Sequence, residues 1–148
     1  MSLYYIAYSC AAILTRLLGG RFIDRQGEDT IIPYALALVG GGLLLLVFMK
    51  ESCLLFFSGF ITGCGHGLLY PALNAHAIRG EPQNVRGKIT GAYTGSIDAG
   101  AFIGSVSLGY VGELAGFQAL FLAAGAVVLC AIFIFRRVNI FKLSRPSG

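Results

Sequence analysis

Hydrophobic residues form long runs in this chain, and charged residues concentrate in the short segments between them. Four runs, 30–49, 52–78, 89–112 and 114–135, contain no charged residue except Asp98, and each reaches the roughly 20 residues that cross the hydrocarbon core of a bilayer. A fifth run, 2–18, is shorter and is interrupted by Arg16. The pattern predicts five membrane-spanning helices, at approximately residues 2–18, 30–49, 53–78, 88–111 and 115–136, followed by a tail at 137–148.

The overall composition supports the membrane interpretation. Hydrophobic residues make up 56% of the chain and charged residues only 12%, whereas a soluble domain carries roughly 25% charged residues. Mean hydropathy is +0.76. We therefore predict an all-α, polytopic membrane protein whose short connections leave no room for a soluble domain.

Basic residues gather on one side of this five-helix topology. Ten of the eleven lie in or beside the first loop, in the third loop or in the tail, and the second loop has only Lys50. The positive-inside rule makes the basic side cytoplasmic, so we expect a multi-pass protein of the cell inner membrane with a cytoplasmic carboxyl terminus. The net charge of +4 then reflects topology, and it does not indicate nucleic-acid binding.

One polar motif stands between the first two runs. The segment RLLGGRFIDRQG has the spacing R-x-x-x-G-x-x-x-D-R-x-G at Arg16, Gly20, Asp24, Arg25 and Gly27. Its glycines permit a tight turn in the predicted loop, and an ionised Asp24 can accept hydrogen bonds at the amino end of a neighbouring helix. We interpret the motif as a latch on the cytoplasmic face. The alternative is a basic loop that only sets orientation, which explains the arginines but neither Asp24 nor the glycine spacing.

The motif resembles the signature loop of the major facilitator superfamily of secondary transporters. That loop lies between helices two and three and, in weaker form, between helices eight and nine. The family pattern continues with two basic residues, whereas Glu28 and Asp29 stand here, which fits the weaker copy. The segments NVRGKITGAYTGSIDAGAFIGSVSLG and GFQALFLAAGAVV are similar to helix eleven with its preceding loop and to the start of helix twelve.

The resemblance implies helices eight to twelve of a twelve-helix transporter, closest to the arabinose-efflux-permease or drug-efflux branches. Such a protein moves a small-molecule substrate across the lipid bilayer by alternating access, and we expect efflux in exchange for protons. It needs no cofactor and no catalytic residues. Its further partner is the amino-terminal half of the transporter, which this chain lacks, or another copy of the chain.

The third predicted helix combines small and polar residues. Three glycines at intervals of four give it a smooth face for close helix packing: Gly59, Gly63 and Gly67. Beside that face stand His66, Tyr70 and Asn74. The resemblance makes this helix ten, which lines the central cavity in the family, and so implies that the three polar side chains contact substrate. The alternative for His66 is a packed histidine bonded to helix backbone.

Asp98 stands ten residues into an otherwise uncharged predicted helix. A carboxylate near the bilayer centre costs at least about 2.5 kcal/mol, so it needs a partner, a proton or water. His66 lies at a similar depth in its own helix, and a His66/Asp98 pair could carry a proton. A structural polar contact and direct recognition of a substrate are the other interpretations of Asp98.

Two other classes of function compete with transport. Glycine-lined helices also suit a non-transporting membrane module, either a truncation product or an assembly partner. A membrane enzyme using the histidines and Asp98 is the weaker alternative, because the sequence shows no metal-ligand spacing, nucleophile motif or phosphate loop. The four cysteines lie in or beside apolar runs without C-x-x-C spacing, and we expect them to be small core residues.

Overall fold

The computed structural model describes residues 2–48 and 52–143, which are almost entirely helical. The helices are α1 (Ser2–Gln26), α2 (Glu28–Leu45), a short 3-10 turn η1 (Leu46–Phe48), α3 (Ser52–Ile78) and α4 (Gln83–Leu143). No strand occurs in the described ranges, and the all-α prediction is confirmed.

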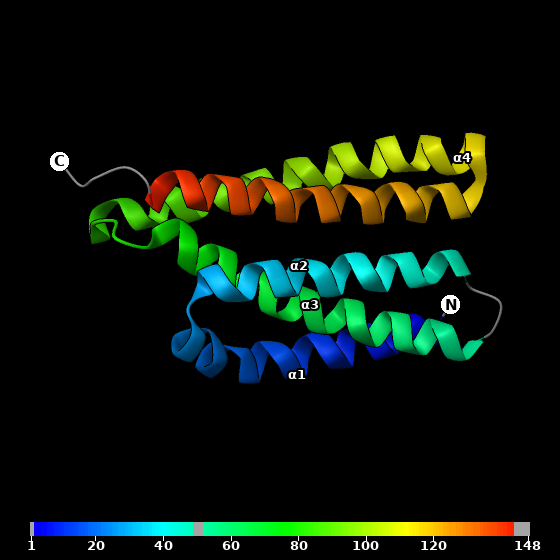
Figure 1. The fold of residues 1–148 in the computed structure, drawn as a ribbon, viewed down its shortest axis with the longest axis horizontal. Coiled ribbons are helices and arrows are strands. Elements are labelled where there is room, and N and C mark those ends of the chain that lie inside the picture. Colours follow the sequence, from blue (N-terminus) through cyan, green and yellow to red (C-terminus); the bar gives the residue numbers. More distant parts are fainter. Residues whose placement is uncertain (1, 49–51, 144–148) are drawn as a thin grey trace.

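The last helix, α4, is two helices joined at Gly116. Its backbone there is non-helical, with φ 83° and ψ 170°, a conformation that glycine adopts readily and other residues do not. Figure 1 shows the chain reversing at this point, so that the first arm (83–115) and the second arm (117–143) run antiparallel. Five helical segments result, as predicted. The second arm continues to Leu143 into the predicted tail, whose residues 144–148 lie outside the described residues.

The first connection is much shorter than the predicted loop. Helix α1 ends at Gln26 and not near residue 18, and α2 starts at Glu28. Gly27 alone makes the turn, with φ 80° and a backbone hydrogen bond from its N–H to the Ile23 carbonyl at 2.9 Å. The prediction of a loop was therefore wrong for the residues before Gly27. The polar motif belongs to the last turns of a helix because a single glycine suffices to reverse the chain.

Helix α3 lies between α1 and α2 (Figure 1). Its three glycines form a close-packing face as predicted, and the helix that packs on it is α1: a methyl group on Gly63 would meet the Tyr8 carbonyl oxygen, with the Tyr8 Cα 2.9 Å away. On the other side, a methyl group on Gly65 would lie 2.7 Å from the Ala35 carbonyl oxygen of α2. Because α3 has glycine on both sides, its backbone lies close to those of α1 and α2.

The second arm of α4 packs on α2, again through small residues. A methyl group on Gly40 would lie 3.2 Å from the Leu129 side chain, and one on Gly125 would lie 2.7 Å from that of Leu44. A small apolar core joins α1, α2 and α3 near the Gly27 turn, with Ile32 and Ala72 fully buried.

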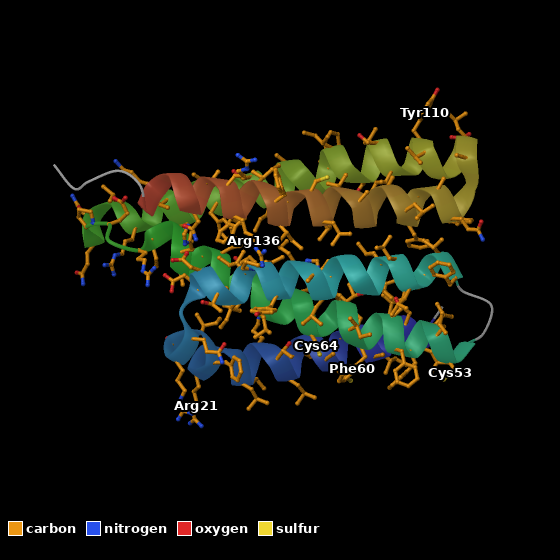
Figure 2. All side chains as sticks on the ribbon, viewed as in Figure 1. Arg21, Cys53, Phe60, Cys64, Tyr110 and Arg136 are labelled. Atoms are coloured by element: carbon orange, nitrogen blue, oxygen red, sulfur yellow. The ribbon has the colours of Figure 1, made fainter. Side chains whose placement is uncertain are left out.

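Much of the apolar surface has no partner within the described residues. Phe102 is 73% exposed and Leu17 is 76% exposed, as expected of side chains that contact lipid or another part of a larger bundle. In Figure 2, Tyr110 projects away from the rest of the molecule. Cys10, Cys53 and Cys130 are exposed as well, so the expectation of core cysteines was wrong for three of the four.

Each of the helices α1, α2, α3 and α4 is long and apolar enough to cross a membrane. The mean hydropathy reaches 2.4 in Glu28–Phe48 and 2.5 in Gln83–Asn139. Figure 1 shows the Gly27 turn, the α3–α4 connection and the carboxyl end of α4 at one end of the molecule, and the Gly116 turn at the other. Most of the described basic residues therefore lie toward one end, as the sequence predicted.

Candidate functional site

A groove of about 360 Å³ runs between α1 and α3. Five of its residues come from α1 and three from α3: Tyr8, Ser9, Ala12, Ile13, Arg16, His66, Gly67 and Tyr70. Close packing of the two helices forms its floor, because a methyl group on Gly67 would lie 2.7 Å from the Ala12 carbonyl oxygen. The predicted substrate residues His66 and Tyr70 therefore share one site with Arg16, which the sequence had placed in the latch.

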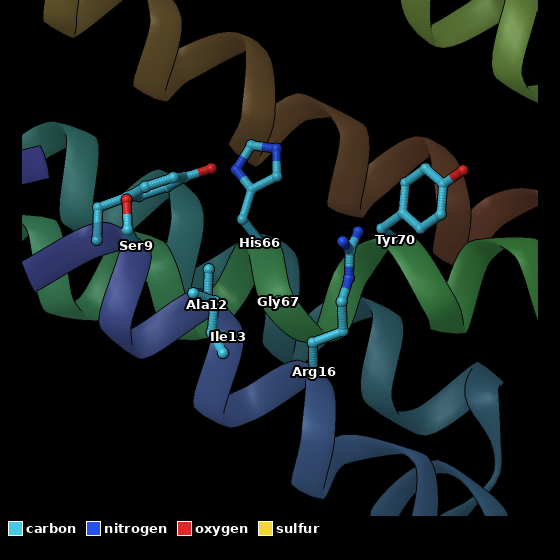
Figure 3. Close-up of a pocket in the computed structure, with 8 residues that line it drawn as sticks. Ser9, Ala12, Ile13, Arg16, His66, Gly67 and Tyr70 are labelled. Atoms are coloured by element: carbon cyan, nitrogen blue, oxygen red, sulfur yellow. The ribbon is translucent and has the colours of Figure 1, made fainter. Parts of the chain in front are cut away.

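Aromatic contacts hold the polar side chains of this groove. The Arg16 guanidinium carbon lies 5.0 Å from the centre of the Tyr70 ring, within cation–π distance. The His66 and Tyr8 rings meet edge to face, 5.9 Å apart. Figure 3 shows the Arg16 side chain rising from α1 into the space between His66 and Tyr70.

A second, larger hollow of about 610 Å³ adjoins the first. It is lined mainly by apolar and aromatic residues from the other end of the bundle, including Leu55, Phe117 and Phe121. Tyr8 and His66 line both hollows. His66 thus stands where an apolar hollow meets a groove that contains a fixed positive charge.

Asn74 belongs to a different contact. The Thr90 hydroxyl donates a hydrogen bond to the Asn74 Oδ1 at 3.4 Å, joining α3 to the start of α4. One turn earlier on α3, the Tyr70 carbonyl accepts a hydrogen bond from the Tyr93 hydroxyl of α4 at 3.3 Å. Asn74 does not line the groove, so the structure brings together only two of the three polar residues predicted on α3.

Asp98 stands apart from the groove, on the first arm of α4. It is exposed, and it forms no hydrogen bond or ion pair with any residue in 2–48 or 52–143. Its neighbours Gly91 and Gly95 face open space. The expected His66/Asp98 pair is not formed in this structure, because the first arm of α4 contacts α3 only near its own start.

The motif residues beyond Arg16 lie on the open side of α1. Gly20, Asp24 and Arg25 are exposed, and a methyl group on Gly20 would meet nothing within 4 Å. Figure 2 shows Arg21 pointing away from the bundle. Within the part of the chain that the structure describes, the predicted latch has no partner for Asp24.

The two acidic residues after the motif instead form a cluster that the sequence analysis missed. Arg79, directly after the last residue of α3, pairs with Glu28 at 3.1 Å and with Asp29 at 3.0 Å. The His76 Nδ1 lies 2.8 Å from the other Asp29 oxygen. Neither of these two atoms has another partner among the described residues, so a proton on Nδ1 donated to Asp29 satisfies both. The sequence did contain a signal for this cluster, because Glu28 and Asp29 stand where the family pattern has two basic residues.

Comparisons with known proteins agree with the fold. The family model described as the Major Facilitator Superfamily matches residues 1–148. An uncharacterized MFS-type transporter of Salmonella typhimurium is 31% identical over 130 residues, which is 87% of this chain and 32% of the relative. One of Pseudomonas aeruginosa is 31% identical over 142 residues, or 96% of this chain and 35% of the relative.

A third relative, the uncharacterized MFS-type transporter YhhS of Escherichia coli, is 28% identical over 132 residues, covering 89% of this chain and 33% of the relative. The chain thus spans about a third of the length of the curated relatives that it matches. Each of these relatives is named as a transporter.

Proposed function

This chain belongs to the major facilitator superfamily, and we propose that it forms helices eight to twelve of a secondary transporter that exports a small solute in exchange for protons. Transport would proceed by alternating access, with one bundle rocking against the other around a site near the bilayer midplane. The amino-terminal half of the fold supplies the second bundle. The relatives are about three times longer than the matched segment, which supports the proposal that the chain acts as part of a larger transporter.

The observation that carries this proposal is that two hollows meet at His66. One opens among apolar residues, the other contains Arg16, and Tyr8 and His66 line both. Ligand sites between helices characteristically combine apolar walls with a few polar groups. A solute moving along α1 and α3 would pass His66 and then Tyr70, and Asn74 would contact it further along.

Asp98 is our candidate for the proton carrier. The described residues leave its carboxylate exposed, yet it lies within a run long enough to span the membrane. A charge at that depth requires a proton, a partner or a water-filled cavity. In the whole transporter, the central cavity between the bundles would supply the water, and Asp98 would alternate between protonated and ionised states.

The motif is our candidate for the gate. Asp24 and Arg25 are exposed at the end of α1, where they are free to contact the other bundle when the cytoplasmic side closes. The basic residues at the same end favour a cytoplasmic location for that side under the positive-inside rule. We accordingly propose an inner-membrane protein with a cytoplasmic carboxyl terminus.

Substitution Asp98→Asn in the whole transporter tests the coupling. Everted vesicles containing the transporter are screened for proton movement driven by a panel of organic anions, organic cations and sugars. We expect the variant to assemble normally and to lose solute-driven proton movement. Glu113→Gln is the matched control, because Glu113 is an exposed carboxylate beside the Gly116 turn. Proton movement at the wild-type rate in Asp98→Asn would remove Asp98 from the mechanism.

A further inference from the structure

The groove between α1 and α3 carries a positive charge. Arg16 is its single lining residue with a permanent charge, and no carboxylate lines it. In the ranges 2–48 and 52–143, no Asp or Glu forms an ion pair with Arg16. We propose that this groove binds a small organic anion, whose carboxylate or similar oxyanion pairs with the Arg16 guanidinium. This inference rests on the proposed transport function and names the class of solute.

The position of Arg16 along α1, well before the basic end of the helix, argues against a role in orientation alone. It is the fifteenth residue of the 25-residue helix α1, so at 1.5 Å per residue it lies about 15 Å from the basic end of that helix. A charged side chain within the membrane region faces the bundle or a water-filled cavity, and it characteristically marks the path of a substrate or an ion. Arg21 differs, because it lies nearer the helix end and points away from the bundle (Figure 2).

The contact with Tyr70 restricts the Arg16 side chain and leaves its N–H donors available to an anion. The Arg16 guanidinium lies over the ring, with its carbon 5.0 Å from the ring centre. Its N–H donors lie along the edge, in a fork that matches the two oxygens of a carboxylate. Holding the side chain over an aromatic ring also reduces the entropy that binding must remove.

The remaining polar groups of the groove suit the same ligand. Tyr8, Ser9, His66 and Tyr70 line it, and each carries an N–H or O–H group that can donate to an anionic oxygen. The volume of about 360 Å³ suits a small solute. Ala12 and Ile13 provide the apolar wall for the rest of the molecule.

Thermal unfolding of the purified whole transporter in neutral detergent tests this inference. The probes are the sodium salts of acetate, lactate, succinate and benzoate, compared with sodium chloride at equal ionic strength, with tetraethylammonium chloride and with glucose. We expect one or more carboxylates to raise the midpoint in a saturable manner. Arg16→Gln should weaken that binding at least tenfold, and Arg16→Lys, which keeps the charge but loses the fork, should weaken it less. Arg21→Gln is the matched control and should bind as the wild type does.

Three results would overturn the inference. The first is stabilisation by tetraethylammonium or glucose and by none of the carboxylates, which needs no variant to interpret. The second is wild-type carboxylate binding by Arg16→Gln. The third is stabilisation only by phosphatidylglycerol in nanodiscs, in comparison with phosphatidylcholine, which would assign Arg16 to a lipid headgroup.

The same panel separates this inference from the proposed function. Proton movement driven by a cation or a sugar, with Arg16→Gln unimpaired, would retain the transporter and reject the anion. Saturable carboxylate binding through Arg16, in vesicles where none of the bound carboxylates moves a proton, would retain the anion site and reject proton-coupled transport.

Discussion

A methyl group added at Gly63 should separate α1 from α3. In Gly63→Ala, the new Cβ would meet the Tyr8 carbonyl oxygen and would lie 2.9 Å from the Tyr8 Cα and 3.0 Å from the Ala11 Cβ. Two of these three atoms are backbone, so no side-chain rotation can relieve the contact. Gly41→Ala is the matched control, because a methyl group there meets nothing within 4 Å.

Comparing the two variants isolates the steric effect. Replacing glycine by alanine inside a helix stabilises it by roughly 0.8–1 kcal/mol, and this gain applies to both sites. Overpacking costs typically about 1–3 kcal/mol, and it applies only at Gly63. We therefore expect the free energy of unfolding of Gly63→Ala to lie about 1–3 kcal/mol below that of Gly41→Ala.

Unfolding of the whole transporter by sodium dodecyl sulphate, followed by far-ultraviolet circular dichroism, measures this difference. The Gly63→Ala transition should occur at lower detergent fraction with a similar slope. Equal free energies of unfolding for the two variants would show that the backbones of α1 and α3 are not in contact at Gly63, and would refute the packing described here.

Two further predictions concern polar contacts between α2 and α3. Ser58 is fully buried and donates to the Gly42 carbonyl at 2.6 Å, so Ser58→Ala should lower the free energy of unfolding by about 0.6–1 kcal/mol in the same assay. The control is Ser105→Ala, which should cost less because the Ser105 hydroxyl bonds within its own helix. An equal cost for the two variants would contradict the interhelical hydrogen bond of Ser58. Arg79→Gln should cost about 1 kcal/mol or less, because the side chain is 58% exposed and such pairs are screened. That cost should shrink when the salt concentration rises, whereas a cost independent of salt would mean that the ion pairs contribute nothing.

Helix count, fold class and one packing face followed from the sequence because each depends on a regular pattern. Long apolar runs specify spanning helices, and glycine at intervals of four specifies a close contact whatever the partner. The partner of that face, α1, was not specified. The second contact, through Gly65, was also missed, since a single glycine out of register gives no periodic signal.

The site was harder to predict because it depends on how helices meet. Arg16 belongs by sequence to the motif, yet packing of Gly67 on Ala12 brings it over Tyr70. The expected pair of His66 and Asp98 rested on equal depth in two helices. Depth fixes height along the membrane but not which helices are neighbours, and the first arm of α4 is held away from α3 beyond its first turns.

Access to the groove from both sides of the membrane is the most direct test of the transport account. A single cysteine replaces Ser9, which lines the groove, in a whole transporter whose native cysteines have been removed. A membrane-impermeant thiol reagent is then applied to right-side-out or to everted vesicles. The account predicts labelling from either side, because it requires the groove to open alternately to each. Labelling from one side alone, under all conditions of pH and solute, would contradict alternating access at this site.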